Sequence, residues 1–172
     1  MTDITLRFGI LTISDRSSRG ERPDMSGPVL VDAVTTKGWQ VVETGIIPDN
    51  VNTIRQKLAE WADSNRFDVV LTTGGTGFAP RDVTPEATRQ IVERLTPGLD
   101  EAMRIASLQV TPHAMLSRAI SGIRKQTLII NLPGSPKGAL ENLQVVIPVL
   151  GHAIELLREN PRAEKGHLAS NP

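Results

Sequence analysis

Two kinds of hydrophobic pattern alternate along this chain. Short, continuous apolar runs are typical of buried strands, and they predict strands at residues 7–14, 39–47, 69–73 and 127–131. Longer stretches with apolar residues every three or four positions predict helices at residues 27–37, 51–64, 86–95, 99–108 and 138–157. Strands that alternate with helices predict an α/β fold, in which right-handed crossovers join parallel strands. We therefore expect a three-layer αβα sandwich around a mostly parallel sheet.

Four segments fit this pattern less well. Residues 16–23 have no periodicity, and they predict a mobile loop that carries three arginines. Residues 115–123 are compatible with a helix or with a turn. Pro148 lies inside the last predicted helix and should kink or divide it, because proline lacks an N–H donor. Residues 159–172 are polar, so we expect one domain over residues 1–158 and a flexible tail after it.

The composition narrows the classes of function. The chain has 172 residues, enough for one domain, and its 19 basic residues balance its 19 acidic residues, so no net charge attracts nucleic acid or an anionic membrane. Aromatic residues make up only 3% of the chain, too few for the stacking platforms that bind single-stranded nucleic acid. Cysteine is absent, and no apolar run approaches the roughly 20 residues of a membrane-spanning helix. We expect a cytoplasmic protein that binds neither nucleic acid nor a membrane.

The predicted strand at residues 69–73 runs directly into a glycine-rich segment. This segment consists of Thr73, Gly74, Gly75, Thr76 and Gly77, and Arg81, Asp82 and Pro85 follow it. Because glycine has no Cβ, an oxyanion can approach the backbone N–H groups, so the segment predicts a phosphate site. It matches neither the P-loop nor the dinucleotide-binding pattern, and a plain tight turn is the alternative. Asp82 could hold a divalent metal or cap a helix that begins near Pro85.

Other polar residues also follow predicted strands. Loops at the carboxyl ends of parallel strands face one crevice, so Asp15, Asp49, the glycine segment and residues 133–137 should meet there. Asp49 could instead cap the next helix, and Ser14 with Asp15 could cap the first helix or order the arginine-bearing loop. Residues 131–137 suit an anion, with a plain turn as the alternative. The three histidines are scattered and lack the spacing of a metal site.

The glycine segment and its surroundings resemble the signature of a known family. The segment 69–86 is similar to that of the molybdopterin-binding family, which the molybdopterin adenylyltransferases share with the corresponding domain of gephyrin. Further matching segments are Thr12–Arg16, Ile47–Asp49, Ser107–Pro112, Met115–Arg118 and Asn131–Lys137. The resemblance covers about Arg7 to Leu157, with the motifs in the same order, and is therefore specific.

The resemblance implies an activity and a set of residues for it. Such an enzyme moves AMP from Mg-ATP onto the terminal phosphate of molybdopterin and releases pyrophosphate. The resemblance implies that Asp49 and Asp82 are the catalytic residues and hold Mg²⁺, and that Thr73, Gly74, Gly75, Thr76 and Gly77 bind the nucleotide. The substrate-binding residues that it implies are Ser14, Asp15, Ser107, Ser117, Arg118, Asn131, Pro133, Gly134 and Lys137. Arg124 and Lys125 are further cationic candidates, although surface cations are mostly just solvated.

The resemblance also implies partners and leaves rivals. We expect a homotrimer, with a hexamer as the alternative, that hands its product to a molybdenum-insertion protein. One rival is a non-catalytic molybdopterin carrier or scaffold of the same family. A second rival is a module that senses a nucleotide. Pyrophosphate release that depends on molybdopterin would separate the enzyme from the carrier.

Overall fold

The computed structural model describes residues 4–159, and its centre is a six-stranded sheet. The strands lie in the order β2-β1-β3-β6-β5-β4. Their bounds are β1 Arg7–Ile13, β2 Gln40–Ile47, β3 Val69–Thr73, β4 Arg94–Leu95, β5 Ser121–Arg124 and β6 Thr127–Leu132. The four strands from β2 to β6 pair in parallel, whereas β5 and β4 join as an antiparallel edge. The expected α/β class with a mostly parallel sheet is confirmed.

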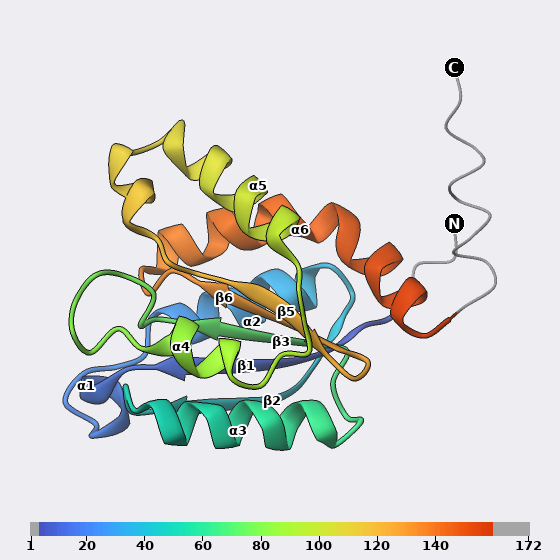
Figure 1. Cartoon of the computed structure of the whole chain (residues 1–172), viewed down its shortest axis with the longest axis horizontal. Helices are drawn as coiled ribbons and strands as arrows, with labels where there is room; N and C mark the ends of the chain where they lie inside the picture. The colour runs from blue at the N-terminus through green and yellow to red at the C-terminus, as the bar shows by residue number, and fades with distance from the viewer. Residues whose placement is uncertain (1–3, 160–172) are drawn as a thin grey trace.

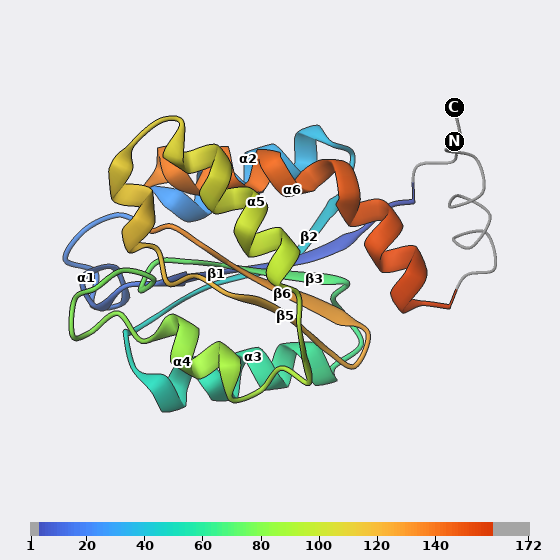
Figure 2. The same ribbon diagram turned by 45° about the horizontal axis from the view of Figure 1, so that its top comes forward.

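Helices cover both faces of this sheet (Figures 1 and 2). Helices α2, α5 and α6 lie on one face, and α3 and α4 lie on the other, so that the molecule has three layers. The helix bounds are α1 Asp15–Ser18, α2 Ser26–Thr36, α3 Val51–Asp63, α4 Thr84–Arg89, α5 Pro97–Leu108 and α6 Pro136–Leu157, with a 3-10 helix, η1, at Pro112–Leu116.

The central strands bury side chains on both faces. In β3, Val70 packs in the core under α3 and α4, whereas its neighbour Leu71 packs in the core under α2, α5 and α6. Successive side chains of a strand point to opposite faces, so a strand covered on both sides is rich in apolar residues without alternation. This explains why β3 begins with the apolar run Val69–Leu71, which two buried threonines follow.

The antiparallel edge of the sheet was not predicted. We expected one helix over residues 86–95, but α4 ends at Arg89 and Arg94–Leu95 form β4. A helix or a turn was expected at residues 115–123, but only residues 115–116 are helical, as the end of η1. Residues 117–120 have no regular structure, and residues 121–123 begin β5. Strands of two and four residues are too short to show alternation, and their pairing with each other is a tertiary contact.

Helix α6 departs from the sequence analysis in two ways. It stays a single helix through Pro148, because Pro148 is exposed while Val146 and Leu150 on either side of it are buried in the core. It has 22 residues, and a window of 18 of them has a mean hydropathy of 1.3, so by length and composition it could span a membrane, contrary to our expectation that no segment would be able to. Its buried side packs against α2, α5 and the sheet, as a core helix does. Apart from Glu159, the expected tail lies outside the described residues.

Candidate functional site

The carboxyl ends of the parallel strands bring three loops together. Thr73 Oγ1 at the end of β3 donates to Pro133 O at 2.6 Å, and the Gly74 N–H donates to Leu132 O at 3.2 Å. Ser26 Oγ at the start of α2 donates to Gly134 O at 2.7 Å. Figure 1 shows α1 and the loop between β3 and α4 at this same end of the sheet. The expected convergence of these loops is confirmed.

Asp15 and Asp49 join the ends of β1 and β2. The Asp15 N–H donates to Asp49 Oδ2 at 2.8 Å, and the Asp49 N–H donates to Asp15 Oδ1 at 3.0 Å. The other oxygen of Asp49, Oδ1, faces Gly75, where an added Cβ would lie 3.1 Å from it. The reciprocal bonds therefore fix the Asp49 carboxylate against the glycine loop.

The surroundings of Asp49 disfavour its negative charge. Burial raises the pKa of Asp49 above its usual range, and the nearby Asp15 and Asp82 carboxylates add to this, against the hydrogen bond from the Asp15 N–H and the charge of Arg81. A raised pKa means that the ionised form is disfavoured here. A bound cation would stabilise this carboxylate, which is the behaviour expected of a metal or phosphate organiser.

The capping explanations for the two aspartates are wrong. Helix α3 is capped by Asn50, whose Oδ1 accepts from the Thr53 N–H at 3.1 Å. Asp82 caps no helix, because α4 begins after Val83 without a side-chain cap, and Asp82 Oδ2 instead accepts from the Ala79 N–H at 2.9 Å. By contrast, Ser14 does cap the short helix α1, through a bond of 3.2 Å from the Ser17 N–H. Residues 16–18, at the start of the expected loop of residues 16–23, are therefore part of helix α1.

The first two glycines of the loop have backbone conformations that other residues avoid. Gly74 has φ +105° and Gly75 has φ +65°. A Cβ on Gly74 would lie 2.3 Å from Ile13 O, and a Cβ on Gly75 would lie 2.4 Å from Thr84 Oγ1. The glycines are therefore needed both for the turn and for the close approach of β1 and α4 to the loop.

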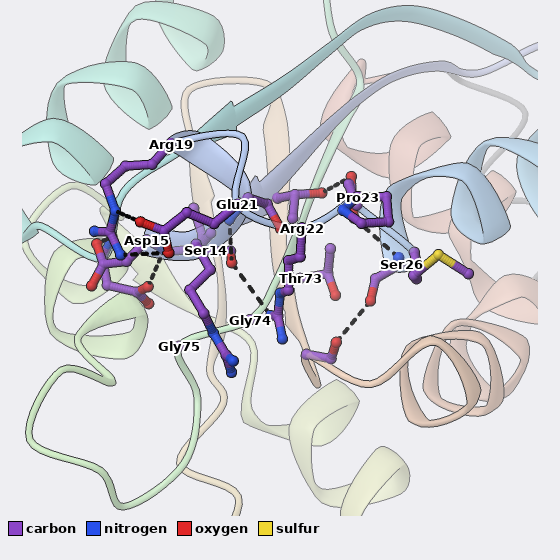
Figure 3. A pocket seen from close by; sticks show the side chains of 18 of the residues that line it. Ser14, Asp15, Arg19, Glu21, Arg22, Pro23, Ser26, Thr73, Gly74 and Gly75 are labelled. Atoms are coloured by element: carbon purple, nitrogen blue, oxygen red, sulfur yellow. Dashed lines mark hydrogen bonds and ion pairs between the residues drawn. The ribbon is translucent and has the colours of Figure 1, made fainter.

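A large cavity of about 840 Å³ opens beside these glycines (Figure 3). Its acidic lining includes Asp15, Asp49 and Asp82, and its backbone lining includes Gly74, Gly75 and Gly134. Ser14, which we expected to bind substrate, also lines it. Arginines that the sequence analysis placed in a loop or near the glycine segment provide its positive charge, namely Arg16, Arg19, Arg22 and Arg81. The cavity has the size of a ligand pocket, and its arginines could bind phosphates.

A second, smaller cavity of about 270 Å³ lies between α5, η1 and the start of α6. Ser107 and Ser117 line it, and the Ser107 hydroxyl accepts a hydrogen bond of 3.0 Å from Asn142 Nδ2. The other predicted residues in its wall are Thr76, Gly77 and Pro133. The glycine loop therefore separates the two cavities, with Gly74 and Gly75 on one side and Thr76 and Gly77 on the other.

This division differs from the one expected from the sequence. We expected Gly74–Gly77 to serve the nucleotide and residues 131–137 to serve the second substrate. Instead, each loop contributes to both cavities, because Gly134 lines the large one and Pro133 the small one. Neighbouring residues in each loop line different cavities, and spacing along the sequence does not reveal which cavity a loop residue lines.

Three expected substrate contacts are not supported by where the residues lie. Asn131 is fully buried, and its Nδ2 donates to Thr72 Oγ1 and Thr88 Oγ1. The Lys137 side chain is 78% exposed and lines neither cavity. Arg118 uses all three side-chain nitrogens on protein groups, namely Gly77 O, Asp82 O and the Glu86 carboxylate.

The other cationic candidates are also placed away from both cavities. Arg124 binds Asp63 through two hydrogen bonds of 2.9 and 2.7 Å, and Lys125 Nζ lies 3.1 Å from the same carboxylate. These pairings lower the pKa of Asp63 to about 2, mainly through the hydrogen bonds from Arg124. The group stabilises the opposite end of the sheet rather than a ligand site.

Asp24 and Asn142 are among the cavity-lining residues that the sequence analysis did not assign to the site. Asp24 lines the large cavity, and its carboxylate accepts from Thr12 Oγ1 and from the N–H groups of Ser26 and Gly27. Asn142 lines the small cavity and holds Ser107. An aspartate just before a helix start was a capping signal for Asp24. Asn142 gave no signal, because it lies in the middle of a helical pattern.

The acidic residues fit magnesium only in company with phosphate. Among residues 4–159, no group of three or more His, Cys, Asp or Glu side chains is placed to hold a metal ion by itself. Mg²⁺ commonly binds through one or two carboxylates together with substrate phosphates and water. Asp49 and Asp82 both line the large cavity and could supply such a partial set of ligands.

Comparison with known proteins agrees with this architecture. Residues 9–152 match the family model described as "Probable molybdopterin binding domain". The chain is 46% identical over 153 residues to the molybdopterin adenylyltransferase of Escherichia coli K12, covering 87% of this chain and 78% of that protein. The crystal structure of the molybdopterin biosynthesis enzyme MoaB from Thermus thermophilus is similar with a TM-score of 0.85 and 48% identity, covering 91% of this chain and 99% of that one.

A longer relative matches through one part of its sequence. The chain is 46% identical over 165 residues to gephyrin of Dictyostelium discoideum, covering 90% of this chain but 23% of that protein. The chain thus spans about a quarter of the length of this relative. The family model, the bacterial relative and the similar crystal structure together show that this chain belongs to the molybdopterin-binding family of MogA and MoaB.

Proposed function

We propose that this protein is a molybdopterin adenylyltransferase of molybdenum cofactor biosynthesis. It would transfer AMP from ATP to the terminal phosphate of molybdopterin and release pyrophosphate. The observation that carries the proposal is the glycine loop, which has a carboxylate-lined cavity on one side and a smaller, serine-lined cavity on the other. Two substrates that must exchange a group fit two cavities with a common wall.

The larger cavity is the one that we assign to ATP. The backbone N–H of Gly75 and the arginines of this cavity suit a triphosphate, because both provide donors to anionic oxygens. The smaller cavity is assigned to molybdopterin, with Ser107 and Ser117 as hydroxyl donors to its phosphate. The phosphate of molybdopterin would then lie at the glycine loop, next to the α-phosphate of ATP.

The reaction needs positioning more than covalent chemistry from the protein. An oxygen of the molybdopterin phosphate attacks the α-phosphorus of ATP in line, and the bond from this phosphorus to the bridging oxygen of pyrophosphate breaks. The protein holds the two phosphates at reacting distance, and its N–H groups and arginines stabilise the charge that spreads over the α-phosphoryl oxygens. Asp49 and Asp82 would hold Mg²⁺, which would neutralise charge on the ATP phosphates. No side chain has to act as a nucleophile.

The assembly and location of the protein extend this proposal. We expect a homotrimer, with a hexamer as the alternative, a cytoplasmic location, and transfer of the product to a molybdenum-insertion protein. Exposed apolar side chains on α5 and η1 offer a surface for such contacts, among them Ile105 at 63% and Met115 at 68% exposure. Sedimentation or light scattering would measure the assembly against the chain mass of 18.7 kDa.

Pyrophosphate release tests the function. The protein is incubated with Mg-ATP, with and without molybdopterin, and pyrophosphate is measured over time. We expect release only when molybdopterin is present. A carrier would bind molybdopterin without releasing pyrophosphate, and a nucleotide sensor would bind ATP tightly without molybdopterin.

A further inference from the structure

Arg118 contacts the loop that lines both cavities. It lies between η1 and β5, and its side chain reaches over the loop that joins β3 to α4. Its Nε donates to Gly77 O at 2.7 Å, and its Nη2 donates to Asp82 O. Its Nη1 pairs with the Glu86 carboxylate on α4, and this hydrogen bond lowers the pKa of Glu86. The guanidinium thus binds the loop at Gly77 and at Asp82, and it also binds Glu86 on the helix that follows.

Residues 76–82 have no other hydrogen-bonded link to the protein within residues 4–159. The Arg118 N–H donates to Thr76 O at 2.9 Å, and its side chain makes the bonds to Gly77 and Asp82. The remaining hydrogen bonds of this segment are internal, between Ala79 and Asp82. Among the described residues, Arg118 therefore makes the hydrogen bonds that tie this segment to the rest of the protein.

This segment carries groups that face both cavities. Thr76 and Gly77 line the small cavity, together with Ser117, the residue directly before Arg118. Asp82 lines the large cavity. Arg118 therefore links the backbone that lines the small cavity, at Gly77, to the backbone of Asp82 at the large cavity.

We propose that Arg118 is a positioning residue, which holds the Asp82 carboxylate toward the large cavity and couples this position to occupancy of the small cavity. The proposal rests on the proposed function, in which the small cavity takes the acceptor and Asp82 organises the donor phosphates. Molybdopterin in the small cavity would fix Thr76, Gly77 and Ser117, and Arg118 would pass this restraint to Asp82. The role is distinct from a direct contact with substrate, because Arg118 lines neither cavity and each of its side-chain nitrogens binds a protein group.

The geometry explains why the residue is an arginine. A guanidinium has five donors in a planar fork and can bind two carbonyls and a carboxylate at once. A lysine keeps the charge but has a single nitrogen, so it can satisfy the ion pair with Glu86 only by giving up carbonyl contacts. Arg118→Lys therefore breaks the paired contacts of the side chain with Gly77 O and Asp82 O, but it keeps the charge and most of the side-chain length.

Arg124→Lys is a matched control. Arg124 lies at the other end of β5 and makes a comparable fork, with two hydrogen bonds to Asp63 and one of 3.0 Å to Ile91 O. It contacts neither cavity. A general loss of stability from a broken arginine fork should therefore affect both variants, whereas a loss of positioning should affect only Arg118→Lys.

Two measurements test the proposal on the full chain. In transfer kinetics we expect Arg118→Lys to lower kcat by roughly 10- to 100-fold with KM for ATP changed less than threefold, since misplacing a catalytic group by about 1 Å can cost about 100-fold. In hydrogen exchange, peptides over residues 76–83 should exchange faster in Arg118→Lys. Molybdopterin alone should slow this exchange in the wild-type protein but not in the variant. Arg124→Lys should match the wild type in both measurements.

Several results would overturn the proposal. Wild-type kcat in Arg118→Lys would show that the paired contacts with Gly77 O and Asp82 O are not needed. A fall in kcat without faster exchange of residues 76–83 would assign Arg118 to substrate contact instead, and equal losses in both lysine variants would indicate general destabilisation. If the wild-type protein itself releases no pyrophosphate with molybdopterin and Mg-ATP, the proposed function fails, and the hydrogen-exchange response to molybdopterin still decides the coupling.

Discussion

The two aspartates of the site are held in different ways. Asp49 is fixed by reciprocal hydrogen bonds with Asp15, in surroundings that disfavour its charge. Asp82 lies in a loop and accepts a hydrogen bond from Ala79 in the same loop. Neither side chain caps the helix that follows it, and both line the large cavity. Carboxylates that lie in a cavity, one of them with a raised pKa, are candidates for function.

Asp82→Asn should separate catalysis from folding. Asparagine keeps an oxygen that can accept from the Ala79 N–H, so we expect a nearly unchanged melting temperature. Loss of the charge should lower adenylyl transfer by roughly 100-fold or more, as for other charged groups that organise a transition state. Steady-state transfer rates and thermal unfolding measure the two effects. Wild-type turnover in this variant would refute the catalytic assignment.

Asp49→Asn should lower activity without lowering stability. Because the folded-state pKa of Asp49 is raised, the native protein holds this proton to higher pH than the unfolded chain does, and the contribution of Asp49 to stability falls as pH rises through that window. Asparagine removes this penalty. The melting temperature of the variant relative to the wild type should therefore increase from acidic to neutral pH.

The same variant tests the link to magnesium. We expect strongly reduced transfer and a higher magnesium concentration for half-maximal rate, with molybdopterin affinity unchanged. Full activity with wild-type magnesium dependence would leave Asp82 as the only supported catalytic carboxylate. If the difference in melting temperature between Asp49→Asn and the wild type did not change with pH, the ionised form of Asp49 would not be disfavoured in the folded protein.

At the scale of elements, the loop between β3 and α4 needs glycine at its first two positions. Gly74→Ala should reduce both stability and transfer, because the new Cβ would lie 2.3 Å from Ile13 O at a φ of +105°. Gly151→Ala in α6 is the control, since a Cβ there meets nothing within 4 Å and alanine favours helix by about 1 kcal/mol. Melting temperatures should move in opposite directions. A Gly74→Ala protein with normal stability and transfer would contradict this account of the loop.

The elements around the small cavity predict a separable binding defect. Ser107→Ala removes the hydroxyl that Asn142 positions at the cavity. We expect molybdopterin to bind roughly tenfold or more weakly, the usual effect of losing a hydrogen bond to a charged group, while ATP affinity stays the same. Calorimetric titration with each ligand measures this difference. Equal losses for both ligands, or a loss for ATP alone, would show that the two cavities are assigned wrongly.

The sequence predicted the elements that lie in the centre of the fold better than those at its edge. The bounds of β3 were predicted correctly, because a strand buried on both faces shows a short apolar run without alternation, here Val69–Leu71. Strands β4 and β5 were missed, since a two-residue strand has no pattern of its own and forms only through pairing. The site followed the same rule. The meeting of the loops followed from topology, but the burial of Asn131 and the engagement of Arg118 are side-chain contacts that spacing does not encode.

At the scale of the whole molecule, the sheet places two cavities on either side of one loop. The parallel strands β1, β2, β3 and β6 direct their carboxyl ends to the large cavity, while α5, η1 and α6 enclose the small one. Asp49 and Asp82 line the large cavity, Ser107 and Ser117 line the small one, and the glycine loop lines both. The central claim is therefore that the two ligands react with each other across this loop.

Labelled ATP tests this claim most directly. The protein is incubated with molybdopterin, Mg²⁺ and ATP that carries radioactive phosphorus at either the α or the γ position, and the pterin product is separated and analysed by mass spectrometry. We predict a pterin product heavier by one AMP unit that carries the α label, with the γ label recovered in pyrophosphate, and roughly 100-fold slower product formation in Asp82→Asn. Unmodified molybdopterin that stays bound to the protein, or a pterin that carries the γ label, would contradict adenylyl transfer.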